Sequence, residues 1–270
     1  MKTMKKTYLF IIVALLTGCG QTSGTGTAKA DTEAAAVDTK AAEADSVSYD
    51  FSNEKLECKV TAPVPEEGLR QAVGEWMDEL LGGCYPGDAS DIKALTEFYG
   101  VAHRDSLSKE IEEDSDRPLF DKLAYEARVE KTFESPLVAS FNLSIYINLG
   151  GAHPSSQEYA ATFRKSDGRR LSWDIIRHYT DYQFKQLLKE YVKEYMNVET
   201  DEEMARMLFD GNDVNNMPWP LTPPQLTAEG IAFVYQQYEI APYALGMPSA
   251  IIPYSRVKPL LTEQAKKLIP

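Results

Sequence analysis

AYEARVEKTFESPLVASFNLSIYIN, residues 124–148, contains two arms in which apolar and polar side chains alternate. The arms cover 124–133 and 137–148, and Glu134-Ser135-Pro136 joins them. Alternation with a period of two is typical of strands that bury one face. The second arm would place its side chains on two faces: Phe141, Leu143, Ile145 and Ile147 on one, Asn142, Ser144 and Asn148 on the other. The pattern predicts a β-hairpin with one buried face.

Helices and further strands are expected on either side of this hairpin. Helical spacing and stop signals predict helices at 69–81, 89–111, 181–197 and 201–209, and a closing helix from Ser255. Further strands are expected at 56–65, as a pair within 158–171, at 231–238 and at 250–254. Because helices and strands are segregated and hairpins are frequent, the sequence predicts an α+β fold. Its antiparallel sheet would be covered by helices, with a smaller α+β N-terminal part.

The N-terminus has the pattern of a secretory signal peptide that ends in a lipobox. Lysines precede the apolar run Tyr8–Leu16, and Leu16-Thr17-Gly18-Cys19 follows. The run is too short to cross a bilayer, which takes roughly 20 apolar residues. We therefore expect residues 1–18 to be removed and Cys19 to carry a lipid. The lipid would anchor the chain to a bacterial membrane, in the cell envelope, facing the periplasm or the exterior. The alternative is an ordinary signal peptide with a chance cysteine.

Composition divides the mature chain into a tether and a folded part. Residues 19–47 are rich in Ala, Thr, Asp and Glu and hold few large hydrophobic side chains. Such a segment buries too little apolar surface to offset its ordering entropy, so we expect a flexible tether. The folded part is expected as a small N-terminal α+β part at 48–135 and a larger C-terminal domain at 136–270.

The chain is strongly acidic. Its formal net charge of −13 becomes −16 when residues 1–18, which hold three lysines and no acids, are removed. Nucleic-acid binding depends on Lys and Arg that neutralise phosphates, so we expect no nucleic-acid partner. The charge would speed the encounter with a basic protein, or it would simply keep the protein soluble.

Two cysteines remain besides Cys19, and we expect Cys58 and Cys84 to form a disulfide in an oxidising compartment. The three histidines are not at the spacing of metal ligands, so no metal is predicted. The sequence also has no dinucleotide fingerprint or phosphate loop, and we expect no cofactor.

Three ordered blocks resemble a known family. They are Ile145–Pro154 with its Gly150-Gly151, Phe163–Ile176 with its Asp167-Gly168 turn, and Leu226–Tyr254. Together they resemble the extracytoplasmic domain of the RsiV-type proteins. This domain-of-unknown-function family is shared with the non-catalytic part of some peptidoglycan deacetylases. The resemblance covers roughly 140–265.

The resemblance implies an α+β sheet-and-helix domain that faces the envelope. In RsiV itself it implies a surface that binds lysozyme and thereby triggers destruction of an anti-sigma factor. That role needs a transmembrane helix and a cytoplasmic sigma-binding segment, and neither is recognised in this sequence. The part that carries over is a recognition domain, with lysozyme or peptidoglycan fragments as its expected ligand.

The candidate binding residues are aromatic side chains and one histidine. They are His153, Trp219, Tyr238, Tyr243 and Tyr254. Tyrosine and tryptophan offer flat amphipathic surfaces, which binding sites often use. The alternative is that these aromatic residues belong to the core. The Pro- and Asn-rich segment 211–224, which contains Trp219, is a second place where a ligand is expected.

His153 is also the best candidate for catalysis, because it lies in a glycine-rich turn near Ser155, Ser156 and Glu158. The sequence has no Gly-x-Ser-x-Gly elbow for a hydrolase. We therefore expect a binding protein rather than an enzyme. The alternatives are an envelope-polymer hydrolase or deacetylase-type enzyme, and a structural scaffold lipoprotein.

Overall fold

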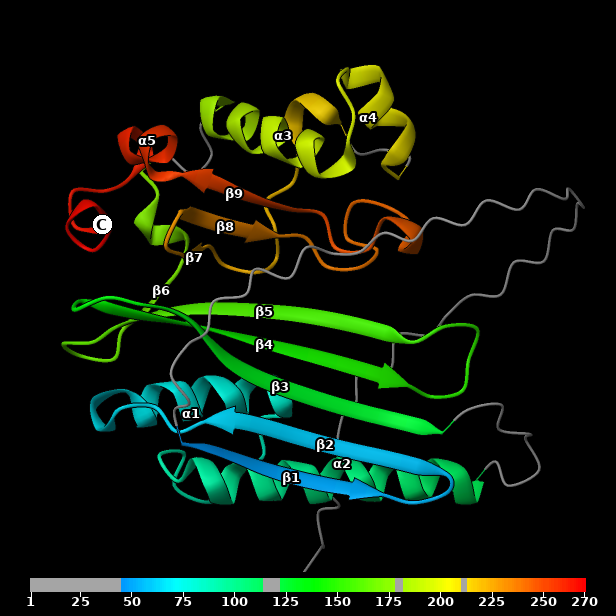
Figure 1. Ribbon diagram of the computed structural model, residues 1–270. Helices are drawn as coiled ribbons and strands as arrows, with labels where there is room; N and C mark the ends of the chain where they lie inside the picture. The colour runs from blue at the N-terminus through cyan, green and yellow to red at the C-terminus, as the bar shows by residue number, and fades with distance from the viewer. Residues whose placement is uncertain (1–44, 114–121, 178–181, 210–212) are drawn as a thin grey trace, which may run out of the picture. The chain divides into compact units, whose positions relative to one another are not determined.

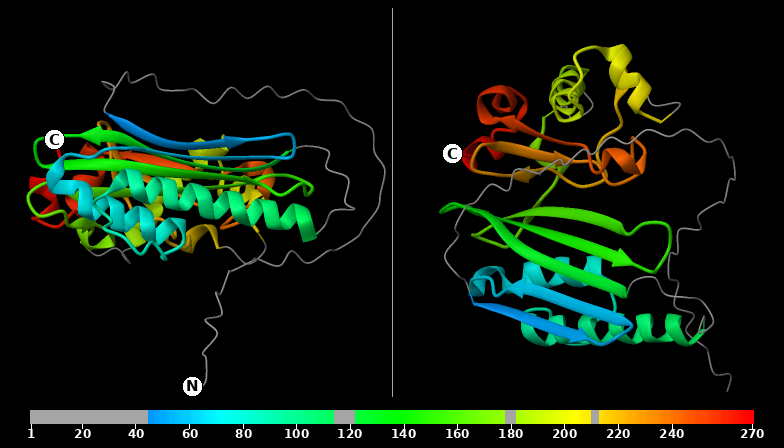
Figure 2. Two further views of the ribbon diagram at one scale, coloured as in Figure 1. Left: turned by 90° about the horizontal axis from the view of Figure 1, so that it is seen from below. Right: turned by 45° about the vertical axis from the view of Figure 1, so that its right-hand side comes forward.

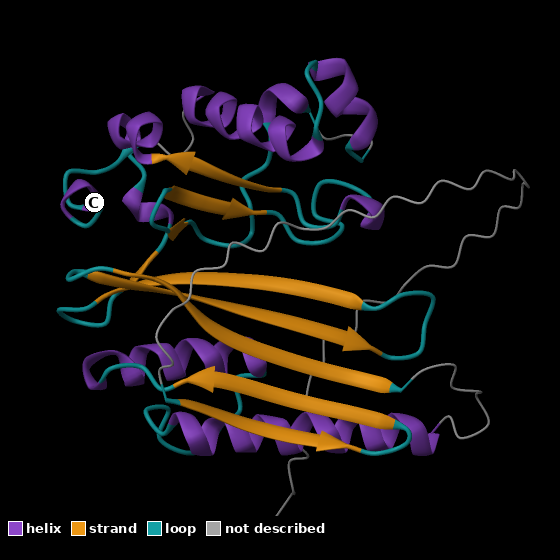
Figure 3. Cartoon of the chain, in the orientation of Figure 1, coloured by secondary structure: helices purple, strands orange, loops and turns teal. Residues whose placement is uncertain are grey.

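The computed structural model describes residues 45–113, 122–177, 182–209 and 213–270. The expected signal peptide, Cys19 and nearly all of the expected tether lie outside the described residues. The described elements confirm a mixed α+β fold with two sheets (Figures 1 and 3).

The larger sheet has six strands in the order β1-β2-β3-β4-β5-β6. Its strands are β1 (Ser46–Ser52), β2 (Leu56–Pro63), β3 (Leu123–Glu134), β4 (Val138–Asn148), β5 (Ser155–Arg164) and β6 (Arg170–Leu171). Neighbouring strands are antiparallel except β2 and β3, which are parallel. A parallel pair needs a long crossover, and the chain between β2 and β3 supplies it with two helices.

The predicted hairpin is β3 and β4, and it is confirmed. The two strands pair from Ala124↔Asn148 to Glu134↔Ala139, with a register shift between Lys131 and Phe133. On β4 the apolar positions Phe141, Leu143 and Ile145 are buried, as the alternation predicts. This side of the sheet packs against α1 and α2, whereas the other side carries polar side chains.

Helices α1 (Glu67–Leu81) and α2 (Ile92–Glu113) cover one face of the larger sheet (Figure 2). Two close approaches require glycine. A Cβ on Gly74 would meet the Ala89 carbonyl oxygen at 1.8 Å, and one on Gly100 would meet the Tyr49 ring at 2.2 Å. These contacts let the helices lie close to their neighbours and enclose the first hydrophobic core.

The predicted disulfide is wrong: Cys58 and Cys84 are free thiols. Cys58 is buried in β2 and its Sγ donates a hydrogen bond to the Gly100 carbonyl oxygen at 3.4 Å. Burial raises the pKa of this thiol to about 11. Cys84 is exposed in the loop that follows α1. Tertiary packing turns one thiol into the core and the other toward solvent, which spacing alone does not reveal.

The second sheet has the order β7-β8-β9. Its strands are β7 (Gln225–Leu226), β8 (Gly230–Val234) and β9 (Ser249–Pro253). Helix α3 (Tyr182–Met196) packs against β9, and α4 (Asp201–Met207) follows it (Figure 1). Phe184, Leu188, Phe233 and Ile252 are central members of the second hydrophobic core.

The closing helix expected from Ser255 is wrong. Helix α5 spans only Tyr254–Val257, and short 3-10 turns follow at Lys258–Leu260 and Ala265–Lys267. Leu261 leaves the helical path and forms a β-bridge with Ile176, while the Thr262 amide donates to the Ile175 carbonyl oxygen at 2.9 Å. This long-range pairing overrides the local helical pattern.

A closed ring of three hydrogen bonds joins the two sheets. Leu226 N donates to Thr162 Oγ1 at 2.9 Å, and Ser140 Oγ donates to the Leu226 carbonyl oxygen at 2.7 Å. The two hydroxyl oxygens lie 2.8 Å apart. Because each hydroxyl has one proton and that of Ser140 is already used, Thr162 must donate to Ser140. Both side chains are fully buried, so the ring satisfies polar groups that water cannot reach.

Side-chain amides continue this junction along the free edge of β5. Gln236 Oε1 accepts from the Glu158 amide at 3.1 Å, and Gln237 Oε1 accepts from the Ser156 amide at 2.9 Å. Thr222 Oγ1 donates to the Glu158 carbonyl oxygen at 3.2 Å. The second sheet therefore adjoins the first through side chains rather than through a continuous ladder.

We predict that Thr162→Val destabilises the protein by about 1–3 kcal/mol. Valine keeps the shape of threonine but leaves the Leu226 amide without its acceptor and Ser140 without its donor. Urea denaturation followed by circular dichroism measures the change. Ser144→Ala, at a half-buried position on the adjacent strand β4 and outside the ring, is the control. An equal effect of both variants would contradict the role of the ring.

Candidate functional site

His153, Tyr238 and Tyr243 meet at the protein surface, although they are far apart in the sequence. The rings of His153 and Tyr243 are stacked with centroids 3.9 Å apart. His153 Nε2 lies 3.0 Å from the Tyr238 hydroxyl, and Nδ1 lies 2.8 Å from the Pro154 carbonyl oxygen. Because a carbonyl only accepts, Nδ1 donates; in the neutral imidazole Nε2 then accepts from Tyr238. We call His153, Tyr238, Tyr243 and Phe209 the aromatic cluster.

The loops that present the cluster are held in fixed conformations. Tyr238 has φ +64°, in the left-handed region that non-glycine residues seldom occupy. Glu239 fixes the turn that contains Tyr238. Its carboxylate accepts from the amides of Gln236 at 2.7 Å and Leu221 at 2.8 Å. Burial raises the pKa of this carboxyl group. A residue with a strained backbone, in a loop held by hydrogen bonds, is frequently part of a binding site.

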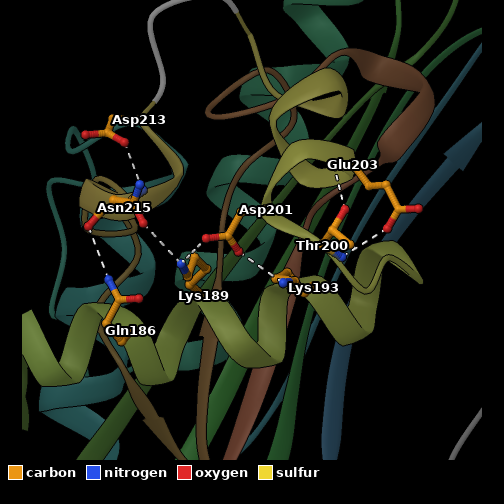
Figure 4. Close-up of polar contacts among 8 residues, drawn as sticks. All are labelled: Gln186, Lys189, Lys193, Thr200, Asp201, Glu203, Asp213 and Asn215. Atoms are coloured by element: carbon orange, nitrogen blue, oxygen red, sulfur yellow. Dashed lines mark hydrogen bonds and ion pairs between the residues drawn. The ribbon is translucent and has the colours of Figure 1, made fainter.

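Phe209 joins the cluster from the end of α4, with its ring 6.4 Å from that of Tyr238. A clamp on α3 fixes the start of α4: Lys189 Nζ lies 2.7 Å and Lys193 Nζ 3.0 Å from the two carboxylate oxygens of Asp201 (Figure 4). Hydrogen bonds from these lysines lower the pKa of Asp201.

A capping box also begins α4. Thr200 Oγ1 accepts from the Glu203 amide at 3.1 Å, and Glu203 Oε2 accepts from the Thr200 amide at 3.0 Å (Figure 4). Capping boxes satisfy the unpaired amides of a helix start. The cap and the lysine clamp together give this short helix a defined position, and with it Phe209.

The other predicted binding residues lie elsewhere. Trp219 packs in the second core, with its ring 4.6 Å from that of Phe184 and 4.9 Å from that of Trp173. Tyr254 is half-buried and donates to the Thr227 carbonyl oxygen at 2.7 Å. Burial raises the pKa of Tyr254 to about 12. The structure thus brings three of the five residues together and places these two in structural contacts.

The segment 211–224 is tied to α3 where it is described. Lys189 Nζ reaches Asn215 Oδ1 at 3.4 Å, Gln186 Nε2 donates to the Asn215 carbonyl oxygen at 3.3 Å, and Lys185 Nζ lies 2.6 Å from Asn216 Oδ1 (Figure 4 shows the first two). Asn215 and Asn216 therefore form hydrogen bonds with lysine and glutamine side chains of α3.

The predicted catalytic candidates are not arranged around His153. Its two ring nitrogens contact Tyr238 and Pro154 rather than Ser155 or Ser156. Glu158 lies on β5 and its side chain accepts a hydrogen bond from Asn142. In residues 45–113, 122–177, 182–209 and 213–270 no group of three or more His, Cys, Asp or Glu side chains has the arrangement of a metal site. The same ranges contain no helix long and apolar enough to span a membrane.

Glu158 lines a cavity of about 390 Å³ that no pattern in the sequence indicates. Side chains from both sheets line it, among them Asn142, Glu158, Gln225 and Ser249. Burial raises the pKa of Glu158, the Asn142 hydrogen bond lowers it, and the negative charge of Glu130 raises it. The available signal was a single acid on the polar face of β5, and only the placement of the second sheet encloses it.

Comparison with known proteins finds one family model that matches within the C-terminal part. Residues 174–255 match the family model DUF3298, described as a protein of unknown function. The match lies within the region that carries the resemblance described above. It supports the domain-of-unknown-function part of that prediction, and the link to RsiV stays a prediction. Among curated proteins, none matches the sequence.

Two solved structures share the fold. A member of the DUF3298 family from Bacteroides fragilis NCTC 9343 is 19% identical, with a TM-score of 0.60 over 81% of this chain and 93% of that chain. A DUF3298 family protein from Pseudomonas aeruginosa PAO1 is 14% identical, with a TM-score of 0.56 over 83% of this chain and 94% of that chain. At these identities the likeness establishes the fold alone.

We predict that Glu158→Gln removes one pH-dependent contribution to stability. The folded pKa of Glu158 is raised, so its protonated form favours folding below the usual carboxyl pKa. That contribution is lost as pH rises through the folded pKa. From pH 4 to pH 7, the unfolding free energy of wild type should therefore fall relative to that of Glu158→Gln in urea titrations. Glu57→Gln, an exposed position on β2, should behave like wild type; identical profiles for all three proteins would contradict the prediction.

Proposed function

We propose that the protein is a lipid-anchored recognition protein of the bacterial cell envelope. It would bind glycan fragments of peptidoglycan at the aromatic cluster, without catalysing a reaction. The observation that carries the proposal is the convergence of His153, Tyr238 and Tyr243 at the surface. Tyr238 is 46% exposed, although its ring is large and apolar. Exposed aromatic groups on braced loops are typical of binding surfaces.

Peptidoglycan glycan fits the chemistry of this cluster. A sugar ring has an apolar face that can stack on tyrosine or histidine, and hydroxyl groups that can bond to their polar atoms. The Tyr238 hydroxyl and the stacked ring of Tyr243 offer both kinds of contact side by side. The RsiV-type resemblance adds that the ligand belongs to the envelope.

A lysozyme-like basic protein is the second candidate ligand, and the net charge of the chain favours it. A charge of −13, or −16 after removal of residues 1–18, would attract a basic partner and raise the association rate. Binding of this kind would weaken steeply with salt, whereas stacking on a sugar would change little. Salt dependence therefore separates the two ligands.

The membrane anchor rests on the sequence around Cys19. We predict that Cys19→Ala moves the protein from the membrane fraction to the soluble fraction or leaves an uncleaved precursor, because the lipid acceptor is lost. Cell fractionation with immunoblotting measures this, and mass spectrometry of the wild-type N-terminus identifies the acyl group. Cys84→Ala is the control. A wild-type chain with an unmodified Cys19 would contradict the anchor.

We predict that Tyr243→Ala weakens binding of purified muropeptides by about fivefold, the loss of about 1 kcal/mol of stacking. Tyr238→Ala should have a similar effect. Isothermal titration calorimetry measures both, with lysozyme titrated in parallel at low and high salt. Tyr182→Ala is the matched control, since Tyr182 is 63% exposed, begins α3 and does not belong to the aromatic cluster.

Two outcomes would contradict the proposal. If wild type binds neither muropeptides nor lysozyme, the recognition role is wrong. If wild type releases sugars or acetate from peptidoglycan and His153→Ala does not, the protein is an enzyme.

A further inference from the structure

The cavity around Glu158 shares no lining residue with the aromatic cluster and has its own chemistry. Strands β3, β4 and β5 contribute one wall, and β8, β9 and the segment before β7 contribute the other. Its volume of about 390 Å³ is within the range of small-molecule sites. The Glu158 amide donates to Gln236 Oε1, and the Glu158 carbonyl oxygen accepts from Thr222 Oγ1. Because these bonds hold the backbone of Glu158 in place, the wall is already formed without a ligand.

Acceptor atoms dominate the polar lining. The amide nitrogen of Gln225 donates to Thr132 Oγ1 at 2.9 Å and to the Phe141 carbonyl oxygen at 3.0 Å, so its remaining polar atom is an acceptor. One of the two side-chain N–H groups of Asn142 donates to one oxygen of the Glu158 carboxylate. In the part of the chain that the structure describes, no other side chain donates to this carboxylate.

The lining also lacks a positive charge to match Glu158. Thr132, Asn142, Glu158, Thr222, Gln225 and Ser249 are its polar members, and no Lys, Arg or His among the described residues lines it. The neighbouring charge that acts on the carboxylate is Glu130, which is also negative. A carboxylate that is largely removed from water without a cation beside it is costly, and such groups are enriched at functional sites.

We propose that this cavity binds the primary ammonium group of a small ligand, with Glu158 as its counter-ion. An ammonium brings one positive charge and three donors, which match the carboxylate, the Gln225 oxygen and the hydroxyl of Ser249. The remaining walls are apolar, with Ala160, Val234 and Met247, and suit an aliphatic stem. A compact ammonium on a methylene chain, as in a lysine-type side chain, is therefore the chemical class that fits.

This site does not depend on the proposed function. Ligands of the aromatic cluster contact His153, Tyr238 and Tyr243, none of which lines the cavity. Tyr243→Ala should leave ammonium binding unchanged, and Glu158→Gln should leave muropeptide glycan stacking unchanged. Failure of one proposal is thus distinguishable from failure of the other.

The test uses N-α-acetyl-lysine amide as the probe and its N-ε-acetyl derivative as the neutral comparison. Nuclear magnetic resonance titration of the purified protein at pH 7 follows the side-chain amides of Asn142 and Gln225. We expect saturable shifts with the charged probe. Glu158→Gln should weaken its binding by about tenfold or more, because a charge-assisted hydrogen bond is lost.

Two further variants complete the test. Glu130→Gln, which removes an exposed acid on β3, two strands away from Glu158, is the matched control. It should change Kd by less than about twofold, since exposed charges contribute little. Ala160→Leu should block the cavity while leaving the carboxylate in place. Equal binding of the charged and neutral probes, unchanged binding by Glu158→Gln, or no shift with wild type up to about 50 mM probe would each overturn the proposal.

Discussion

The hydrogen-bonded ring of Ser140, Thr162 and Leu226 is the constraint on which the arrangement of the two sheets depends. One face of the larger sheet is apolar and is covered by α1 and α2. The second sheet therefore contacts polar side chains of β4 and β5. A buried polar junction is stable only when its groups are paired. The ring closes without an unpaired proton, and it fixes β7 against β4 and β5.

This junction accounts for both candidate sites. The segment after β8 holds the edge of β5 through Gln236 and Gln237, and its next residue, Tyr238, belongs to the aromatic cluster. The second sheet also supplies part of the wall of the cavity that Glu158 lines. Rigid side-chain contacts between the sheets therefore position an exposed aromatic surface and an acidic cavity close together, each suited to a different ligand chemistry.

Several elements could be predicted because their signals are local. The alternation in β4, the helical spacing in α3 and the Asp167-Gly168 turn place each element within a few residues of its observed bounds. The errors have long-range causes. Leu261 pairs with Ile176 instead of continuing a helix. Cys58 turns into the core while Cys84 faces solvent. The first two residues of β1 were expected in the tether, but β1 joins the sheet by pairing with β2.

Local patterns were enough to predict the α+β class, the buried face of the hairpin and the glycine-rich turn that carries His153. They extended one strand to Tyr238, whereas β8 ends at Val234 and Tyr238 lies in a turn. Periodic burial and turn chemistry act over a few residues, so they can be read from neighbouring positions. Only the packing of the two sheets brings His153, Tyr238 and Tyr243 together, keeps Trp219 and Tyr254 away from them, and makes Glu158 part of a cavity. Such contacts join residues some 80 positions apart, and they arise from the packing of two sheets, which no local pattern specifies.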